Sequence, residues 1–527
     1  MTKDNNRLRE RALFDSLKDR KSGKVWPHHL LQAIDHAGLE QHDPRLQEVF
    51  TRLEALREQS QGVPQELGFE EFRSIISLSV LLLERAFKQE LVIPDFQEFK
   101  KDVTQIFAQA KHNADGEVAN YIPQLGRVNP ELFGVAVCTI DGQRFKIGDA
   151  DTSFCVQSST KPMKYCLALE EHGEERVHAH IGCEPSGLSF NELTLNDKGL
   201  PHNPMINAGA IMSCSLIKSN LTMADRFDYV LDKWQAMMGG VRPGFSNPTY
   251  LSERLTADRN FALGYSMREN RAFPENCNLI ETLEFYFQCC SLEVTANNMA
   301  VLAATLANGG VCPTTGVRVL QAQTVQKCLS FMYSCGMYDF SGEWAFRIGL
   351  PAKSGVSGVI MTVIPNVMGI VSWSPKLDKN GNSVRGIEFC RQLVNTFNFH
   401  NYDNIVGGLH GKKDPRVDAN AVRRNLGVDL CWAASEGDLA GIKRLLISGA
   451  SLDDADYDGR TALHLAAAEG QLEVVRYFLD HGIKVSPKDR WGNTPFDDAV
   501  RAGHKKVANL LQTRLEKQAG REIKQVS

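Results

Sequence analysis

The chain has 527 residues, enough for three or four domains of roughly 150 residues each. With 43% hydrophobic and 23% charged residues, its composition is that of an average globular protein, which excludes a wholly disordered chain. Its net charge of −4 offers no basic excess for nucleic acid or an anionic membrane, and no apolar stretch reaches the roughly 20 residues needed to span a bilayer.

Residues 1–92 are predicted to form a helical bundle. Apolar side chains recur there at helical spacing, for example at Leu13 and Leu30, in segments separated by polar breaks. Residues 18–29 also place Gly23 at the sixth position, as the calcium loop of an EF-hand does. The positions where Ca²⁺ needs oxygen ligands are instead occupied by Lys18, Arg20, Ser22 and His29. We therefore expect an EF-hand-like domain without calcium ligands.

Residues 93–405 are predicted to form an α+β domain. Asp141-Gly142 lies between the apolar runs 133–140 and 144–147, a pattern typical of a β-hairpin. Further patterns predict two helices and two strands, at residues 163–171, 295–307, 358–364 and 369–373. Antiparallel strands mixed with many helices favour the α+β class.

A 33-residue repeat marks the C-terminal part, where Gly437, Gly470 and Gly503 recur at that interval. Ankyrin units have this period and a T-P-L-H-x-A signature, which TALHLA at 461–466 resembles. The predicted segments are a linker, the ankyrin repeats and a tail, at residues 406–427, 428–515 and 516–527. Ankyrin arrays are binding or assembly surfaces, so we expect a protein partner here. We expect His464 of the signature to be structural.

The cysteines and histidines do not predict a metal or disulfide site. Thirteen cysteines are scattered between Cys138 and Cys431 without a C-x-x-C spacing, which favours reduced buried thiols. His178 and His180 follow a polar stretch and are not expected to bind a metal. The first residues lack the apolar core of a secretory signal and are too acidic for a transit peptide. We therefore expect either a mature or trimmed chain or a cytosolic protein.

Two S-x-x-K motifs place a serine and a lysine one helical turn apart, so that the amine can accept the hydroxyl proton. They are Ser158–Lys161 and Ser215–Lys218, and about two such matches are expected by chance. Ser158 follows the hairpin and opens a helix with Pro162 in its first turn, where the positive helix end favours an alkoxide. Burial there would keep Lys161 neutral. Nothing completes a site around Ser215.

A second element, Lys353-Ser354-Gly355, is similar to the K-T-G that accompanies S-x-x-K in serine β-lactamases and penicillin-binding proteins. Taken alone, this tripeptide could equally be the start of an ordinary β-strand after Pro351, without a catalytic role. Longer segments add to it: YIPQL at 121–125, FCVQSSTKPMKY at 154–165, HNPMINAGAI at 202–211, SCGMYDFSG at 334–342 and LPAKSGVSG at 350–358. With these, the chain resembles the animal-type, phosphate-activated glutaminases of the serine-dependent β-lactamase-like superfamily. That family also has an EF-hand-like helical region, a transpeptidase-like central α+β domain and C-terminal ankyrin repeats.

The resemblance implies catalytic roles for matching residues. Ser158 would attack the side-chain carboxamide and Lys161 would activate it. Tyr338 would be a proton-transfer partner, and the backbone N–H groups of Ser158 and Val356 would form the oxyanion hole. Ser159 is two residues from Lys161 and would face away from it on a helix, so Ser158 is the predicted nucleophile.

The resemblance also implies a substrate-binding set. Its members are Tyr121, Ser158, Asn207, Glu253, Asn260, Tyr286, Tyr338 and Val356. A free amino acid presents an ammonium and a carboxylate, so one anionic acceptor, Glu253, and several neutral donors suit it. Residues 187–198 correspond to the mobile loop of the family beside the active site.

The resemblance implies hydrolysis of L-glutamine to L-glutamate and ammonia through a serine ester, without a metal or organic cofactor. The resemblance further implies inorganic phosphate as activator, a homotetramer with filament formation left open, and a mitochondrial location, with the cytoplasm as the alternative. Two rival functions stay open. One is a β-lactam or peptide acyl hydrolase, and the other is a non-enzymatic scaffold with a vestigial central domain.

Overall fold

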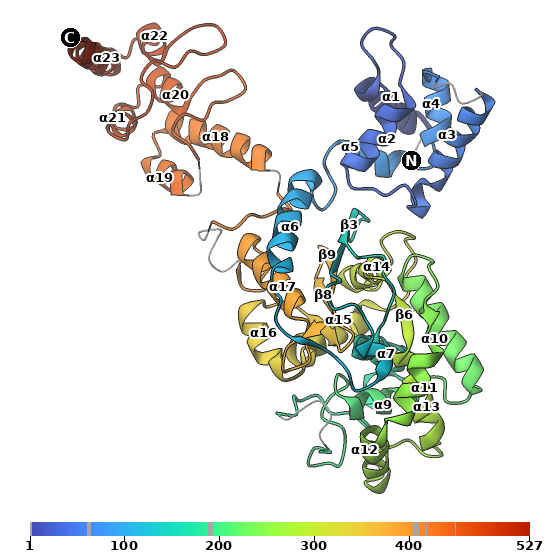
Figure 1. Ribbon diagram of the computed structural model, residues 1–527. Coiled ribbons are helices and arrows are strands. Elements are labelled where there is room, and N and C mark those ends of the chain that lie inside the picture. Colours follow the sequence, from blue (N-terminus) through green and yellow to red (C-terminus); the bar gives the residue numbers. More distant parts are fainter. Residues whose placement is uncertain are drawn as a thin grey trace. The chain divides into compact units, whose positions relative to one another are not determined.

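The computed structural model describes residues 3–60, 65–187, 193–403, 411–417, 419–447 and 450–526. They belong to two compact units, Met1–Arg416 and Val417–Ser527, each of which is described by itself (Figure 1). The predicted loop at 187–198 and the predicted linker at 406–427 both include residues outside the described ones. No helix among the described residues is both long and apolar enough to cross a bilayer.

The first unit begins with a helical bundle, as predicted. Its elements are α1 (Lys3–Leu17), α2 (Pro27–His36), η1 (Pro44–Leu46), α3 (Gln47–Gln59), α4 (Phe69–Ile76) and α5 (Val80–Phe87). Leu30, Val49 and Phe72 are fully buried in a core shared by these helices. An antiparallel bridge between Val25 and Leu67 joins the segment after α1 to the segment before α4, so backbone bonds connect the two halves of the bundle.

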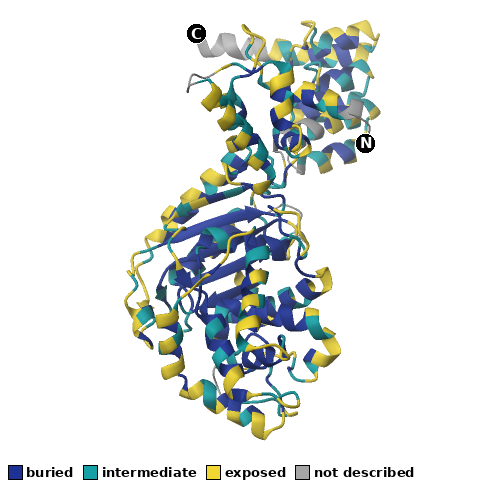
Figure 2. Cartoon of the chain, turned by 90° about the vertical axis from the view of Figure 1, so that its right-hand side faces the viewer, coloured by how far each residue is buried: buried dark blue, intermediate teal, exposed yellow. Residues whose placement is uncertain are grey.

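The central domain is built on a five-stranded antiparallel sheet with the strand order β3-β2-β9-β8-β7. The strands are β2 (Gly134–Thr139), β3 (Arg144–Gly148), β7 (Ala352–Gly355), β8 (Val359–Ile364) and β9 (Met368–Trp373). The predicted hairpin is β2–β3, and β8 and β9 are the two other predicted strands. Along β2, Val135 and Val137 enter one hydrophobic core while Ala136 and Cys138 enter the other. Both faces of the sheet are therefore buried (Figure 2).

Helices cover both faces of this sheet. α6 (Phe96–Lys111) and α17 (Val384–Thr396) pack on one face, and α14 (Ala296–Ala307) packs on the other (Figure 1). The other helical elements are α7 (Pro123–Gly126), η2 (Gln157–Thr160), α8 (Lys161–His178), α9 (Asn207–Leu216), α10 (Met223–Met237), α11 (Asn247–Leu255), α12 (Asp258–Glu269), α13 (Leu279–Cys290), α15 (Ala322–Cys335), η3 (Tyr338–Phe340) and α16 (Ser341–Arg347).

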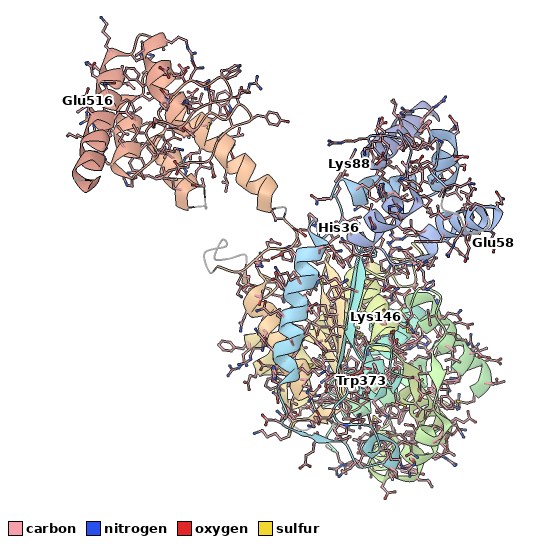
Figure 3. The ribbon with its side chains drawn as sticks, turned by 45° about the horizontal axis from the view of Figure 1, so that its top comes forward. His36, Glu58, Lys88, Lys146, Trp373 and Glu516 are labelled. Atoms are coloured by element: carbon pink, nitrogen blue, oxygen red, sulfur yellow. The ribbon has the colours of Figure 1, made fainter. Side chains whose placement is uncertain are left out.

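Short strands connect the sheet to the helical side. They form the pair β1 (Glu117–Val118) and β10 (Lys376–Leu377), and a small sheet of β4 (Phe154–Cys155), β6 (Leu292–Val294) and β5 (Gly244–Phe245). Trp373 of β9, labelled in Figure 3, is 1% exposed and stacks on Phe154 of β4 with ring centroids 5.2 Å apart. This aromatic pair fixes β4, and the turn that follows it, against the large sheet.

The helical bundle is joined to the central domain at the turn of the β2–β3 hairpin. Arg45 Nη1 donates to the Asp141 carbonyl at 2.8 Å. Gln143 Nε2 donates to the carbonyls of Ala37 at 2.9 Å and Ile93 at 3.0 Å. Because Asp141 and Gln143 are themselves buried, these bonds are shielded from water and hold the two parts together as one unit.

The second unit consists of antiparallel helix pairs joined by loops, as expected for ankyrin repeats. The helices are α18 (Ala419–Glu436), α19 (Leu439–Ile447), α20 (Ala462–Ala468), α21 (Leu472–Asp480), α22 (Pro495–Arg501) and α23 (Lys505–Val526). One core runs through all pairs and includes Leu463, Phe478 and Leu511. Residues 419–427 of the predicted linker belong to α18, and residues 516–526 of the predicted tail belong to α23.

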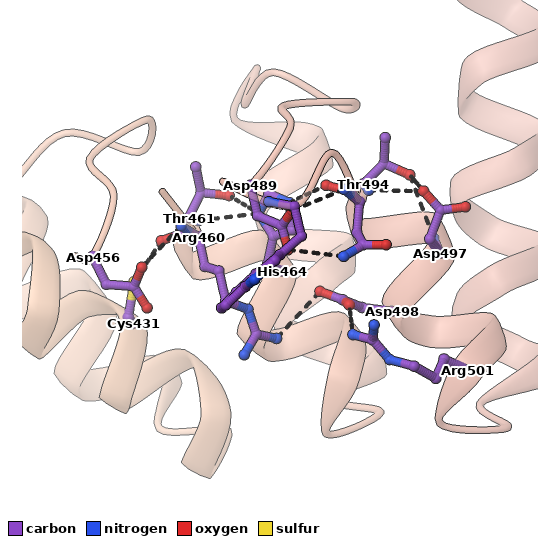
Figure 4. A network of polar contacts seen from close by, with 12 residues as sticks. Cys431, Asp456, Arg460, Thr461, His464, Asp489, Thr494, Asp497, Asp498 and Arg501 are labelled. Atoms are coloured by element: carbon purple, nitrogen blue, oxygen red, sulfur yellow. Dashed lines mark hydrogen bonds and ion pairs between the residues drawn. The ribbon is translucent and has the colours of Figure 1, made fainter. Parts of the chain in front are cut away.

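His464 is structural, as its place in the repeat signature predicts. Its Nδ1 accepts the backbone N–H of Thr461 at 3.0 Å, and its Nε2 lies 3.2 Å from the Asn493 carbonyl of the next repeat (Figure 4). Nε2 must therefore carry the proton and donate it. Burial lowers the pKa of His464. The neutral imidazole thus links consecutive repeats.

Asp498 makes a second link between repeats. The fully buried carboxylate accepts from Arg460 Nη2 of the preceding repeat at 3.2 Å and pairs with Arg501 (Figure 4). We expect Asp498→Ala to lower the free energy of unfolding of this unit by about 3 kcal/mol, because Arg460 loses its carboxylate partner. Amide hydrogen exchange of α20 and α22 in the full chain measures the loss.

The matched control is Asp458→Ala. Its carboxylate pairs with Arg490 at 2.8 Å, but both side chains are exposed, so the pair contributes under about 1 kcal/mol. Equal loss of protection in the two variants would contradict a special role for Asp498.

Candidate active site

The predicted nucleophile lies in a tight turn between a strand and a helix. β4 leads into η2, which carries Ser158, and α8 begins at Lys161 with Pro162 in its first turn. Gln157 adopts a left-handed φ of 48°, which bends the chain sharply just before the serine. Lys161 Nζ lies 2.6 Å from Ser158 Oγ. The pair predicted from the S-x-x-K spacing is therefore in hydrogen-bond contact.

The neighbouring Ser159 is oriented differently. It is fully buried, and its Oγ donates to the Val156 carbonyl at 2.5 Å. Ser158, by contrast, is only half-buried. Of the two adjacent hydroxyls, only that of Ser158 combines contact with the lysine and access to a substrate.

Lys161 has the surroundings that a neutral amine requires. The side chain is fully buried, and burial lowers its pKa to about 7, with the charge of Lys164 acting in the same direction. Its Nζ also donates to Asn207 Oδ1 at 2.8 Å. A neutral amine that uses one N–H on Asn207 keeps its lone pair for the Ser158 proton.

Two amides fix the orientation of this amine. Asn207 is the first residue of α9, and its Nδ2 donates to Asn260 Oδ1 of α12 at 3.1 Å. The Asn207 oxygen thus faces Lys161, and its nitrogen faces Asn260. Both asparagines of the predicted substrate-binding set thus belong to one hydrogen-bond chain that ends at Ser158.

A carboxylate and a phenol of the predicted set meet on another side of the turn. Tyr121 Oη donates to Glu253 Oε1 at 2.6 Å, and Gln157 Oε1 lies 3.3 Å from the same hydroxyl. Burial raises the pKa of Glu253, and its hydrogen bonds with Tyr121 and Gln157 oppose that shift. Tyr121 is 49% exposed, which places it at an opening rather than in the core. Glu253 is therefore an acceptor reachable past Tyr121.

Tyr338 contacts the nucleophile from a segment far away in the sequence. Its backbone has a left-handed φ of 54°, its Oη donates to the Ser354 carbonyl at 3.2 Å, and its side chain hydrogen-bonds Ser158. Burial raises the pKa of Tyr338, so the phenol holds its proton. It also lines a pocket of about 510 Å³ together with Ile206 and Cys335.

The end of β7 packs directly against the nucleophile turn. A Cβ on Gly355 would lie 2.9 Å from the Val156 carbonyl oxygen and 3.4 Å from the Ser159 nitrogen, so only glycine allows this approach. Val356 follows, and its Cγ1 and the Tyr338 ring both lie near Gly381. The predicted oxyanion pair of Ser158 and Val356 therefore lies on adjacent segments, and its hydrogen-bond role stays a prediction.

Residues that the sequence analysis set aside have structural partners. Ser215 Oγ donates to the Met212 carbonyl at 2.7 Å and Lys218 lies 3.9 Å from Glu171, so the second S-x-x-K forms no pair. His178 bonds Tyr165 and the Ile181 carbonyl, and His180 bonds the Ala272 carbonyl. Among the described residues, no cluster of three or more His, Cys, Asp or Glu side chains is arranged for a metal ion.

Two residues around the site, Gln157 and Lys164, were not predicted from the sequence. Gln157 connects Tyr121 to the nucleophile turn. Its position next to Ser158 is the one sequence feature that could have indicated this role. Lys164 is buried one helical turn after Lys161, with its Nζ 4.2 Å from the ring centroid of Tyr286. Helical spacing predicts that Lys161 and Lys164 lie on the same face of the helix. Because lysines are rarely buried, the sequence did not indicate that Lys164 lies in the core.

Comparisons with known proteins agree with this geometry. Residues 116–402 match the Glutaminase family, residues 430–521 match Ankyrin repeats (3 copies) and residues 9–94 match an EF-hand domain. The chain is 48% identical to the glutaminase liver isoform, mitochondrial, of Mus musculus over 92% of this chain and 80% of that protein. It is 44% identical to putative glutaminase 3 of Caenorhabditis elegans over 95% and 87% of the two chains.

A solved structure described as the probable glutaminase ybaS shares the central fold. It has a TM-score of 0.55 and 37% sequence identity, and the match covers 58% of this chain and 98% of that one. The family match over more than half of the chain and the extended identity to animal relatives lead to one conclusion: this chain belongs to the glutaminase family of amidohydrolases.

Proposed function

We propose that the protein hydrolyses L-glutamine to L-glutamate and ammonia, with Ser158 as nucleophile and Lys161 as its base. The observation that carries this assignment is the 2.6 Å contact between Ser158 Oγ and a buried amine whose pKa is about 7. At neutral pH a large share of this amine is unprotonated, so it can take the hydroxyl proton.

The reaction then proceeds in two halves. Ser158 Oγ attacks the side-chain carboxamide carbon while Lys161 takes its proton, and the oxygen of the tetrahedral intermediate faces the N–H groups of Ser158 and Val356. The proton then passes to the amide nitrogen, and the Tyr338 phenol beside Ser158 Oγ relays it. Ammonia departs, and Ser158 remains bound to the substrate as a γ-glutamyl ester. Water, deprotonated by the same amine, attacks the ester, and the amine returns this proton to Ser158 Oγ as glutamate leaves. No metal or organic cofactor takes part in these steps.

The surrounding residues suit the α-amino-acid end of glutamine. Glu253 offers a buried carboxylate for the ammonium, and Tyr121 holds that carboxylate in place. Asn207, Asn260 and Tyr286 supply neutral donors for the substrate carboxylate. The ammonium thus finds a partner of opposite charge and the carboxylate finds neutral donors, whereas a simple amide would use neither.

Ammonia release from glutamine, compared with asparagine and with hydrolysis of a chromogenic β-lactam, tests this function. Turnover of glutamine alone is the expected result. Hydrolysis of only the lactam would establish the rival acyl hydrolase, and absence of turnover on all three would favour the scaffold reading. Repeating the glutamine assay with added inorganic phosphate tests activation, which we expect to raise the rate.

The pH dependence follows from Lys161. Protonation removes the lone pair that accepts the Ser158 proton, so kcat/KM for glutamine should fall as the pH drops through about 7, the pKa of the amine. At pH values well below this pKa, kcat/KM should fall by about tenfold per pH unit. Initial rates between about pH 5.5 and 9 measure it, and a flat profile across neutral pH would be inconsistent with this base.

Glu253→Gln is expected to raise KM for glutamine by about 10- to 100-fold, because a charged hydrogen bond to the ammonium becomes a neutral one. Steady-state kinetics with glutamine measure this change, and kcat should change less. Glu284→Gln is the control, since that carboxylate pairs with Arg254 at 2.6 Å on the outer side of α13. Equal KM values in both variants would remove Glu253 from the binding site.

Assembly and location extend the proposal. We propose a homotetramer, with filament formation as a further state. Sedimentation of the purified chain with and without phosphate tests this assembly. The relatives described as mitochondrial support a mitochondrial location. The ankyrin unit would bind a protein partner.

A further inference from the structure

Lys353, the first residue of the K-S-G motif, is a buried amine that the proposed mechanism does not use. Its side chain is fully buried, although lysines are among the residues least often found in a protein core. A buried amine needs hydrogen-bond acceptors, because N–H groups left without them cost free energy. The acceptors of Lys353 therefore indicate which parts of the chain it holds.

The Lys353 amine donates to two backbone carbonyls on different segments. Its Nζ lies 3.0 Å from the Gly336 oxygen and 2.9 Å from the Ser354 oxygen. Gly336 follows α15, and Ser354 belongs to β7, which lies at the edge of the large sheet. The outer side of an edge strand has no neighbouring strand to bond its backbone groups. The amine thus connects the outer side of β7 to the turn that leads into Tyr338.

The same two carbonyls also take part in holding Tyr338. The Ser354 carbonyl accepts from the Tyr338 phenol at 3.2 Å, and the Gly336 carbonyl accepts from the Ser354 N–H at 3.1 Å. In addition, Lys353 Nζ lies 4.5 Å from the centroid of the Tyr338 ring. The amine therefore contacts the carbonyl that binds the phenol, the carbonyl that precedes the tyrosine in the turn, and the ring itself.

The backbone of this turn needs such support. Tyr338 has a left-handed φ of 54°, a conformation that persists in a residue with a side chain only where the surroundings hold it. Gly336 lies so close to β7 that a Cβ there would overlap the Ala352 carbonyl, so the turn and the strand touch backbone to backbone. A shift of either segment would move the phenol relative to Ser158, to which it is hydrogen-bonded.

We propose that Lys353 is a positioning residue of the active site: its amine ties the edge of β7 to the turn at residues 336–338 and so holds the Tyr338 phenol against Ser158. Because it is fully buried, it acts through Tyr338 rather than on the substrate. The neutral and the charged amine both supply the N–H groups that these contacts need, so the role does not depend on its protonation. The inference rests on the proposed function, because it requires the Tyr338 phenol to relay the proton.

Lys353→Met removes the amine and keeps a side chain of similar length. We expect kcat for glutamine to fall by about 10- to 100-fold, because small displacements of a catalytic group are costly. KM should change by less than about threefold, since other residues hold the charged ends of the substrate. The thermal midpoint should change little, because both carbonyls keep a second donor. Steady-state kinetics and thermal unfolding of the full chain measure these effects.

Tyr338→Phe determines whether Lys353 acts through the phenol. This variant should lose about 10³-fold in kcat, a loss typical of a missing proton-transfer group. If the amine only positions the hydroxyl, adding Lys353→Met to Tyr338→Phe should lower kcat by less than about threefold more. Losses that multiply in the double variant would show a role independent of Tyr338 and would overturn the inference. A wild-type kcat in Lys353→Met would overturn it as well.

Lys218→Met is the matched control. Its Nζ also lies over a tyrosine ring, 5.2 Å from the centroid of Tyr229, but neither residue belongs to the active site, so kcat and KM should be those of the wild type. If Lys353→Met does not fold, Lys353→Gln replaces it in the same double-variant comparison. A wild type that releases no ammonia from glutamine, or a Tyr338→Phe variant as active as the wild type, would instead contradict the proposed function.

Discussion

Ser158→Ala is expected to reduce ammonia release from glutamine by about 10⁴-fold or more, because removal of a covalent nucleophile leaves only binding and oxyanion stabilisation. The lost atom is the hydroxyl oxygen 2.6 Å from Lys161 Nζ. Ser158 is half-buried and lies outside the hydrophobic cores, so the thermal midpoint should barely change. Mass spectrometry of acid-quenched wild type should find a glutamyl adduct on the peptide that contains Ser158, and none in the variant.

Ser159→Ala provides the comparison at the neighbouring hydroxyl. Its Oγ donates to the Val156 carbonyl, so the substitution should cost about 1 kcal/mol of stability and leave turnover within about tenfold of the wild type. The reverse pattern, with Ser159→Ala inactive and Ser158→Ala active, would exchange the two roles.

Features of this protein that depend on nearby residues could be predicted from the sequence. Asp141-Gly142 predicts the hairpin because only a few residue pairs suit so tight a turn, and the recurrence of glycine every 33 residues predicts the repeat unit. The contact between Ser158 and Lys161 is of the same kind, since three positions along a helical segment bring two side chains together.

Contacts between remote segments carry no such local signal. Tyr121 and Glu253 are 132 positions apart, and their hydrogen bond depends on how α7 and α11 pack, so only the resemblance to a family indicated both. Lys164 shows the opposite difficulty. Its spacing from Lys161 was visible, but its burial against Tyr286 and three thiols results from the packing of α8 on α9 and α13.

Lys161→Met is expected to lower kcat/KM for glutamine by about 10³-fold or more at every pH, because the variant has no group to accept the Ser158 proton. Folding should be preserved or improved, since a thioether of similar length replaces a fully buried amine. Rates across the pH range, with thermal unfolding as the fold control, measure both effects. Activity that returned at high pH would show that another base serves Ser158.

Lys161→Arg separates the need for a base from the need for a cation. A guanidinium stays protonated at any working pH, so this variant keeps a positive charge and still cannot accept a proton. We expect it to be as inactive as the Met variant, because the Asn207 carbonyl holds the native amine in an orientation useful only when its lone pair faces Ser158. Substantial turnover by Lys161→Arg would mean that the charge merely stabilises an alkoxide. The requirement for a neutral amine would then no longer hold.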